Sequence, residues 1–370
     1  MDPPSDVETT VAGVFFQTAH ASFVTARDQR GTADLWLYIA RRTVRFRFAG
    51  ARISEIIAPV FTHLQTSPQS TADLTVLLWD AASTGIDLPP IQWQRDDVDR
   101  AGKVRGFCDA RFAAVHEPDT RQFWMLDRRS ATAVVWMNDV DAVPLWDRIH
   151  PLRKLLHAWA RGFGADLVHA GAVGIDGAGV LVVGPGGTGK STTVLAAMHA
   201  GLSAAGDDYV LVDAGSPSGS PPTAHAPTAH ALYGTMRLHQ AHLDRFPALM
   251  THHDHVFEEP WSGQAKVTSY ISRHLPDRLT AEVRLVGIVI PQVVLPQVAS
   301  HESLEVARET PARALLALAP SSLLQVDPTD AAMFTRMAWL CRLLPCWRLP
   351  LGPDLACVAD RLARLISAQA

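Results

Sequence analysis

The sequence predicts a mixed-sheet α/β domain with flanking helices over residues 151–370, preceded by a smaller α+β domain over residues 1–150. Three observations lead to this prediction. A chain of 370 residues is too long for one ordinary small core. The first half mixes strand-like with helix-like patterns. The second half contains a strand, a glycine-rich loop, a helix and a further strand in succession.

The composition indicates a soluble globular protein. Hydrophobic residues make up 48% of the chain and charged residues 19%, with a net charge of −4, which excludes a disordered or collagen-like chain. Basic residues are dispersed and outnumbered by acidic ones, so we expect no nucleic-acid partner, although a local basic groove stays open. The N-terminus does not have the pattern of a signal or transit peptide, and no apolar run has membrane-spanning length. We therefore expect a cytoplasmic protein with no membrane partner.

The four cysteines support the same compartment. Their positions fit neither metal-ligand spacing nor an obvious disulfide pattern, which predicts reduced and mostly buried thiols. They are Cys108, Cys341, Cys346 and Cys357.

In the first domain, alternating apolar residues over 35–48 predict two short strands, and helical spacing over 52–64 predicts a helix. Further strands are expected at 74–80, 121–127 and 132–138. These segments are rich in aromatic residues, which we interpret as core packing; a ligand groove is the alternative.

The second domain is predicted to begin with a linking helix over 144–164, which stops at a glycine. Proline, serine and glycine over 215–231 favour a mobile surface loop. The histidines at 252, 253 and 255 fit either a metal site or, preferably, a solvated loop, because no carboxylate or cysteine spacing accompanies them. The other expected elements are strands at 167–176, 179–184, 203–213 and 284–294, and helices at 191–201, 237–246, 310–319 and 354–366.

Residues 184–191, GPGGTGKS, fit the phosphate-loop pattern G-x-x-x-x-G-K-[ST], between an apolar strand and a helix. Glycines let backbone N–H groups point at phosphate oxygens, and the helix adds its positive N-terminal end. Lys190, one of only four lysines, would reach the β- and γ-phosphates, and Ser191 would bind magnesium. The expected ligands are therefore ATP and Mg²⁺. The predicted nucleotide-binding residues are Gly184, Pro185, Gly186, Gly187, Thr188, Gly189, Lys190, Ser191 and Thr192.

An acidic pair, Asp207 and Asp208, follows Lys190 by 17 and 18 residues. The helix after the loop can return the chain to a neighbouring strand, whose end would then lie beside the phosphates. One carboxylate could hold the cation while the other acts as base toward a hydroxyl. The alternative is an ordinary Asp-Asp turn before the strand. His169 precedes the loop on a predicted neighbouring strand.

The run from Val168 to Asp213 resembles the catalytic domain of HPr kinase/phosphorylase and its HPr-kinase-like relatives. In that family a His-x-Gly-like strand, the G-x-x-G-x-G-K-S loop and an Asp-Asp pair occur in this order at about this spacing. Weaker similarity continues through ALYGTMRL, residues 231–238, and through the tail at 344–362. The resemblance covers roughly Asp166 to the C-terminus, and the first 150 residues resemble no family that we can name.

The resemblance implies a P-loop kinase domain that transfers the ATP γ-phosphate to a serine/threonine-type hydroxyl. It places His169 beside the acidic pair, with Asp208 as the catalytic base and Asp207 on the metal side. Arg237 and Lys266 could contact the transferred phosphate or be ordinary surface residues. An E-x-R-G-x-G-like segment is missing after the acidic pair, so phosphorylase activity and HPr as substrate are not expected.

Some relatives of this reduced type resemble peptide-tailoring kinases of lasso-peptide gene clusters, which suggests a peptide or protein as phosphate acceptor. A ribosomal peptide precursor is one such acceptor, and the first domain could recognise it. Two alternatives remain: a small-molecule hydroxyl kinase, and a nucleotide-dependent regulatory or binding module with little turnover. Related kinases often form hexamers, so a homo-oligomer is possible.

Overall fold

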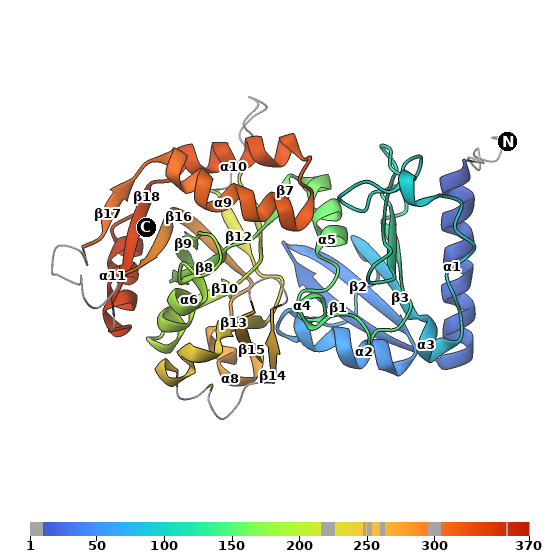
Figure 1. Ribbon diagram of the computed structural model, residues 1–370, viewed down its shortest axis with the longest axis horizontal. Coiled ribbons are helices and arrows are strands. Elements are labelled where there is room, and N and C mark those ends of the chain that lie inside the picture. Colours follow the sequence, from blue (N-terminus) through green and yellow to red (C-terminus); the bar gives the residue numbers. More distant parts are fainter. Residues whose placement is uncertain are drawn as a thin grey trace. The chain divides into compact units, whose positions relative to one another are not determined.

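The protein is a mixed α/β protein, and its computed structural model describes residues 10–215, 226–246, 249, 254–259, 263–294, 305–352 and 354–369. The chain divides into two compact units (Figure 1). One comprises Met1–Pro59 and Gln65–Pro151, and the other comprises Val60–Leu64 and Leu152–Ala370. The break at Pro151 lies beside the predicted boundary at residue 150, but five residues of the first half belong to the second unit.

The first unit is a six-stranded sheet with the strand order β1-β2-β3-β6-β5-β4 and helix α1 packed against it. Its elements are α1 (Val11–Arg30), β1 (Thr32–Ile39), β2 (Arg42–Ala49), α2 (Ala51–Ile57), β3 (Leu74–Asp80), α3 (Ala81–Thr84), β4 (Phe112–Glu117), β5 (Gln122–Asp127), β6 (Thr132–Met137) and α4 (Leu145–Arg148). Aromatic side chains of α1, β3, β4, β5 and β6 share one hydrophobic core, which fits the predicted core packing, whereas Tyr38 of β1 is exposed. Helix α1 and strand β4 were not predicted.

Two predicted helices are interrupted by proline. The helix expected over 52–64 ends at Ile57 and continues as 3₁₀ helix over Ala58–Leu64, because Pro59 lacks the N–H for an α-helical hydrogen bond. The single helix expected over 144–164 was also wrong. It is divided at Pro151 into α4 and α5, and Leu152 takes a left-handed conformation with φ +61°.

The second unit contains a large sheet and a small three-stranded sheet in the described part of the chain. Its elements are α5 (Arg153–Ala160), β7 (Ala165–Val168), β8 (Gly171–Ile175), β9 (Ala178–Val182), α6 (Lys190–His199), β10 (Ser203–Gly206), β11 (Val210–Asp213), β12 (Thr228–His230), β13 (Thr235–His239), β14 (His255–Glu258), β15 (Ala265–Tyr270), α8 (Ile271–His274), β16 (Glu282–Val293), β17 (Ala307–Glu309), α9 (Pro311–Val326), α10 (Ala331–Leu343), β18 (Cys346–Leu351) and α11 (Ala356–Ser367).

The large sheet runs β10-β8-β9-β16-β12-β11-β7, with β18 on β16 and β17 on β18. Strands β9, β16 and β18 are parallel, so their carboxyl ends meet at one edge, where the glycine-rich loop follows β9. Helices α6 and α11 pack against β8 and β9, while α9 packs against β7 and β16. The small sheet, β13-β15-β14, has a face in the same core as α6.

Several other sequence predictions need correction. Residues 237–246 are not an α-helix: β13 ends at His239 and a 3₁₀ helix covers Gln240–Arg245, because pairing with β15 outweighs the local helical spacing. The predicted loop over 215–231 ends in the buried strand β12, and its residues 216–225 lie outside the described part, as do His252 and His253. His255 is exposed on β14.

Only half of the cysteines are buried, namely Cys341 and Cys346, whereas Cys108 and Cys357 are exposed; all four are free thiols. In the described part of the chain, no helix is both long and apolar enough to cross a membrane.

Candidate active site

The glycine-rich loop connects the end of β9 to the first residue of α6 and has a backbone that only glycine adopts easily. Gly187 and Gly189 have φ values of +81° and +100°, in the left-handed region. A Cβ atom at Gly189 would also lie 2.3 Å from Leu351 Cδ1, so the Leu351 side chain would have to shift. The backbone conformation therefore favours glycine at the last turn before the helix, and the contact with Leu351 adds to this preference.

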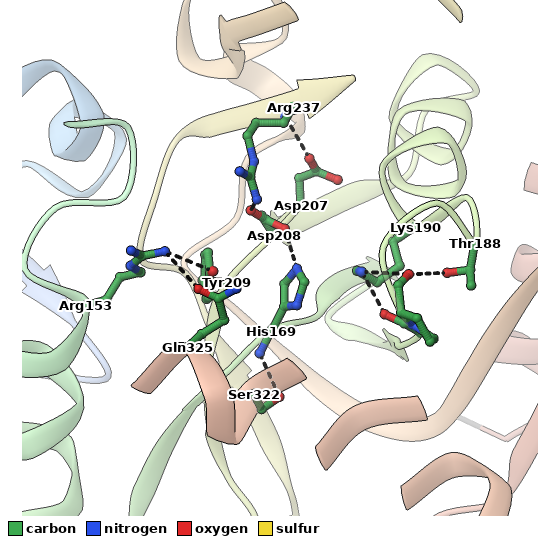
Figure 2. Close-up of polar contacts among 12 residues, drawn as sticks. Arg153, His169, Thr188, Lys190, Asp207, Asp208, Tyr209, Arg237, Ser322 and Gln325 are labelled. Carbon is green, nitrogen blue, oxygen red and sulfur yellow. Dashed lines mark hydrogen bonds and ion pairs between the residues drawn. The ribbon is translucent and has the colours of Figure 1, made fainter. Parts of the chain in front are cut away.

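The Lys190 side chain lies in this loop and is buried. Its Nζ donates to the carbonyl oxygens of Gly184 at 2.8 Å and Pro185 at 3.4 Å (Figure 2). Burial lowers the pKa of Lys190, while the negative charges of Asp208 and Asp207 oppose this effect. The ammonium group thus lies between the loop's carbonyl groups and the acidic pair.

Asp208 is the carboxylate of the pair that lines the pocket. Its Oδ1 lies 2.7 Å from His169 Nε2, and its Oδ2 accepts a hydrogen bond from the Arg237 guanidinium (Figure 2). All three side chains are largely buried. A carboxylate held by two donors in this way has a fixed orientation toward the pocket.

Asp207 precedes Asp208 in the chain, does not line the pocket and is 1% exposed. Its Oδ2 accepts the backbone N–H of Arg237 at 3.1 Å, whereas Oδ1 is buried without a hydrogen-bond partner among the described residues. Burial, and then the charge of Asp208, raise the pKa of Asp207 to about 7, although the Arg237 N–H, Ser191 and Lys190 oppose this shift. A bare carboxylate oxygen beside a serine hydroxyl is a fitting place for a hard cation.

His169 is held from three directions. Besides Asp208, the Ser322 hydroxyl of α9 accepts its backbone N–H at 3.0 Å, and the Tyr209 ring stacks on the imidazole with centroids 5.2 Å apart. Burial lowers the pKa of His169, and Asp208 opposes this. A neutral imidazole with its proton on Nε2 would donate to Asp208.

Arg237 and Lys266 come from paired strands of the small sheet and share one counter-ion, Glu259. Lys266 Nζ lies 2.7 Å from Glu259 Oε1, and Arg237 Nη1 lies 3.8 Å from the same oxygen. Sequence reasoning missed Glu259, which follows β14 directly and is 4% exposed. The only sequence signal was a carboxylate just before a strand that carries a lysine.

These groups surround one pocket of about 350 Å³ within the second unit. Of the predicted residues, those that line it are His169, Gly186, Gly187, Gly189, Lys190, Ser191, Thr192, Asp208, Arg237 and Lys266. The others, Gly184, Pro185, Thr188 and Asp207, do not line it. Side chains that were not predicted also line it, namely Leu238, His239, His242, Arg245, Glu259, Val293, Ser321, Leu324, Gln325 and Leu351.

Nowhere among the described residues do three or more histidine, cysteine, aspartate or glutamate side chains form a metal cluster. A divalent ion at Asp207 and Ser191 would therefore need oxygen ligands from a bound phosphate, which is the usual coordination of Mg²⁺.

Comparison with known proteins gives limited similarity. No protein-family model matches the chain, and no curated protein matches it. Among solved structures, the chain is similar to the Hpr(Ser) kinase/phosphatase from Coxiella burnetii, with 14% sequence identity and a TM-score of 0.28. The similar region covers 55% of this chain and 97% of that chain.

Proposed function

We propose that this protein is an ATP- and Mg²⁺-dependent kinase that transfers the γ-phosphate to a serine/threonine-type hydroxyl of a peptide or protein. The observation that carries the proposal is the composition of one pocket: Asp208, bound to His169, faces the same space as the phosphate loop and Lys190. A protein that only binds nucleotide needs the loop, but it has no need for an oriented carboxylate beside it.

The loop and the cationic side chains account for phosphate binding. The N-terminal end of α6 and the loop N–H groups would hold the β- and γ-phosphates, and Lys190 would exchange its carbonyl partners for phosphate oxygens. Arg237 and Lys266 would offset the charge that spreads over the phosphoryl oxygens during transfer. Both side chains are held toward the pocket by their bonds to acidic groups.

Asp207 and Ser191 are the residues that would hold Mg²⁺. The buried Oδ1 of Asp207 has no hydrogen bond from the described residues, so a cation could take that position without displacing a donor. When bound, the ion would neutralise part of the phosphate charge and orient the β- and γ-phosphates.

Asp208 is the proposed catalytic base. The acceptor hydroxyl would give its proton to an Asp208 oxygen while its own oxygen bonds to the γ-phosphorus. The bond from that phosphorus to the β–γ bridging oxygen breaks, and ADP leaves. Each carboxylate oxygen has two lone pairs, so an oxygen that accepts a bond from His169 or Arg237 can also accept a proton.

The acceptor class rests on the sequence resemblance of residues 168–213 to HPr-kinase-like proteins, including peptide-tailoring kinases. The missing E-x-R-G-x-G-like segment favours a substrate other than HPr. A ribosomal peptide precursor fits both points, with the first unit as its proposed recognition domain. Half-buried His239 and His242, and Arg245, line the same pocket and could contact a peptide beyond the reacting hydroxyl.

The phosphate-loop assignment is tested with Lys190→Ala, using Lys154→Ala on α5 as the matched control outside the pocket. We expect Lys190→Ala to weaken ATP binding by about 100-fold, or roughly 3 kcal/mol, and to abolish transfer, because the phosphates lose a buried cation. Calorimetric titration with ATP and a labelled-ATP transfer assay measure the two effects. Unchanged affinity together with unchanged transfer would contradict the assignment.

The acceptor is tested by mass spectrometry of a precursor peptide co-expressed with the protein, where a kinase adds one phosphate. Free serine in the labelled-ATP assay tests the small-molecule alternative. If ATP binds with wild-type loop residues but no acceptor gains phosphate, the protein is a nucleotide-dependent binding module instead.

A further inference from the structure

A short segment from the first half of the chain is built into the catalytic unit. Val60–Leu64 belongs to the second unit, although Pro59 and Gln65 on either side belong to the first. The segment is the main part of a 3₁₀ helix, and Val60 and Phe61 are fully buried. The segment is therefore buried within the same unit that contains the pocket.

The backbone of this segment is fixed to the chain just before strand β13. The Val60 carbonyl accepts the N–H of Gly234 at 2.8 Å, and a Cβ atom at Gly234 would lie 2.7 Å from His63 Nδ1. A glycine is thus needed for the segment to lie this close. Three residues further along β13 is Arg237, whose N–H and guanidinium hold the acidic pair.

Aromatic rings extend from the same segment to the pocket. The Phe61 ring contacts Tyr233 with centroids 5.5 Å apart, and Tyr233 contacts Tyr209 edge-on at 6.3 Å. Tyr209 stacks on His169 at 5.2 Å, and Arg153 donates to its hydroxyl at 3.1 Å (Figure 2). Three ring contacts therefore connect a residue of the first half of the chain to the imidazole that binds Asp208.

We infer that Phe61 is a positioning residue of the catalytic pocket: it supports the Tyr233 and Tyr209 rings behind His169 and so fixes the His169–Asp208 pair. The effect on catalysis rests on the proposed kinase function, whereas the effect on His169 does not. Rings in a close-packed interior have little free space, so the loss of one ring lets the next ones move. Small shifts of a catalytic group cost large factors in rate.

The test compares Phe61→Leu with Phe23→Leu, which makes the same change at a buried phenylalanine of α1 that packs on Trp79 in the first unit. We expect Phe61→Leu to lower kcat for phosphoryl transfer about tenfold with ATP affinity unchanged, because the nucleotide site keeps its loop and lysine. Phe23→Leu should lose similar stability and keep kcat. If Phe61→Leu does not fold, Phe61→Met removes the ring while keeping a flexible apolar side chain.

A second readout does not depend on activity. The ring resonances of His169, assigned with a His169→Gln variant, report its stacking on Tyr209. They should shift in Phe61→Leu and in Tyr233→Leu, and the double variant should shift no more than the larger single change if both act along one path. Unshifted His169 resonances in Phe61→Leu, together with an unchanged kcat, would overturn the inference. Shifted resonances in a protein that transfers no phosphate would retain it while removing the kinase proposal.

Discussion

Asp127 in the first unit and Asp207 in the second are both 1% exposed, yet their surroundings differ in one decisive way. Asp127 accepts hydrogen bonds on both oxygens, from the Arg111 guanidinium, the Arg129 N–H and the Ser130 hydroxyl. Burial would raise the pKa of Asp127, but these donors outweigh burial and lower it. Asp207 has one oxygen without a hydrogen bond from any described residue, and its pKa is raised to about 7.

Under the proposed function, the difference separates a carboxylate that stabilises the fold from one that would bind a ligand. Breaking the bonds of a fully hydrogen-bonded buried charge costs stability, whereas a buried charge with a bare oxygen is itself a cost until something binds there. Asp208, beside Asp207, is well bonded, but its donors come from His169 and Arg237, which also line the pocket. We therefore expect substitutions in the two units to have opposite consequences.

The largest expected effect comes from exchanging carboxylate for amide at the two kinds of position. Asp208→Asn should lower the rate of phosphoryl transfer by at least about 1000-fold, because an amide cannot accept the hydroxyl proton. Asp127→Asn should leave kcat within about twofold and instead lower the free energy of unfolding by about 1–3 kcal/mol. Transfer assays and urea unfolding on both variants measure this. Equal kcat in Asp208→Asn and wild type would remove Asp208 from the chemistry.

The sequence predicted the local part of the site better than the assembled part. The glycine-rich segment 184–191 is one contiguous motif, and the structure has it between strand β9 and the start of helix α6. Asp207 and Asp208 could be proposed because the helix after the loop limits where the chain returns. Glu259, Tyr209 and Phe61 were missed, since their importance depends on contacts between segments far apart in the sequence.

Errors in the fold have similar physical causes. Helix α1 was missed because the sequence at this end of the chain has no clear apolar stripe. Its aromatic residues become buried only because the helix packs on the sheet. The helix predicted at 237–246 failed because Arg237 and Leu238 pair with β15. Tertiary pairing overrides a weak local preference, which no pattern within ten residues can reveal.

The second expected effect is a change in the free energy of unfolding, which Asp207→Asn should raise and Asp127→Asn should lower. It is measured without nucleotide and with EDTA. The pKa of Asp207 is raised from 3.8 to about 7, so the unfolded state loses its proton first as pH rises. The resulting cost begins above pH 4 and is complete above pH 7. Asp207→Asn should therefore raise the free energy of unfolding at pH 8, by on the order of 3 kcal/mol, and change it little at pH 4.

Asp127 should respond in the other direction. Its lowered pKa means that the ionised form stabilises the fold at neutral pH, and that this contribution is lost as pH falls through the folded pKa. Asp127→Asn should thus be less stable than wild type at pH 8. Urea unfolding at pH 4 and pH 8 gives both results. A destabilised Asp207→Asn protein at pH 8 would show that Asp207 is a structural carboxylate like Asp127.

The smallest expected effect concerns two exposed leucines of α9, of which only one lines the pocket. Leu324 is 74% exposed and lines the pocket, whereas Leu316 is 68% exposed and does not line it. A ligand that covers part of a leucine gains roughly 0.5–1 kcal/mol. Leu324→Ser should therefore raise KM for ATP or for the acceptor about two- to fivefold at unchanged kcat, and Leu316→Ser should change neither. Both variants should keep wild-type stability, because each side chain is already in water.

Steady-state kinetics with each substrate varied in turn measures these KM values and also shows which ligand covers Leu324. Equal KM values in both variants would limit the ligand site to the loop, β13 and β15.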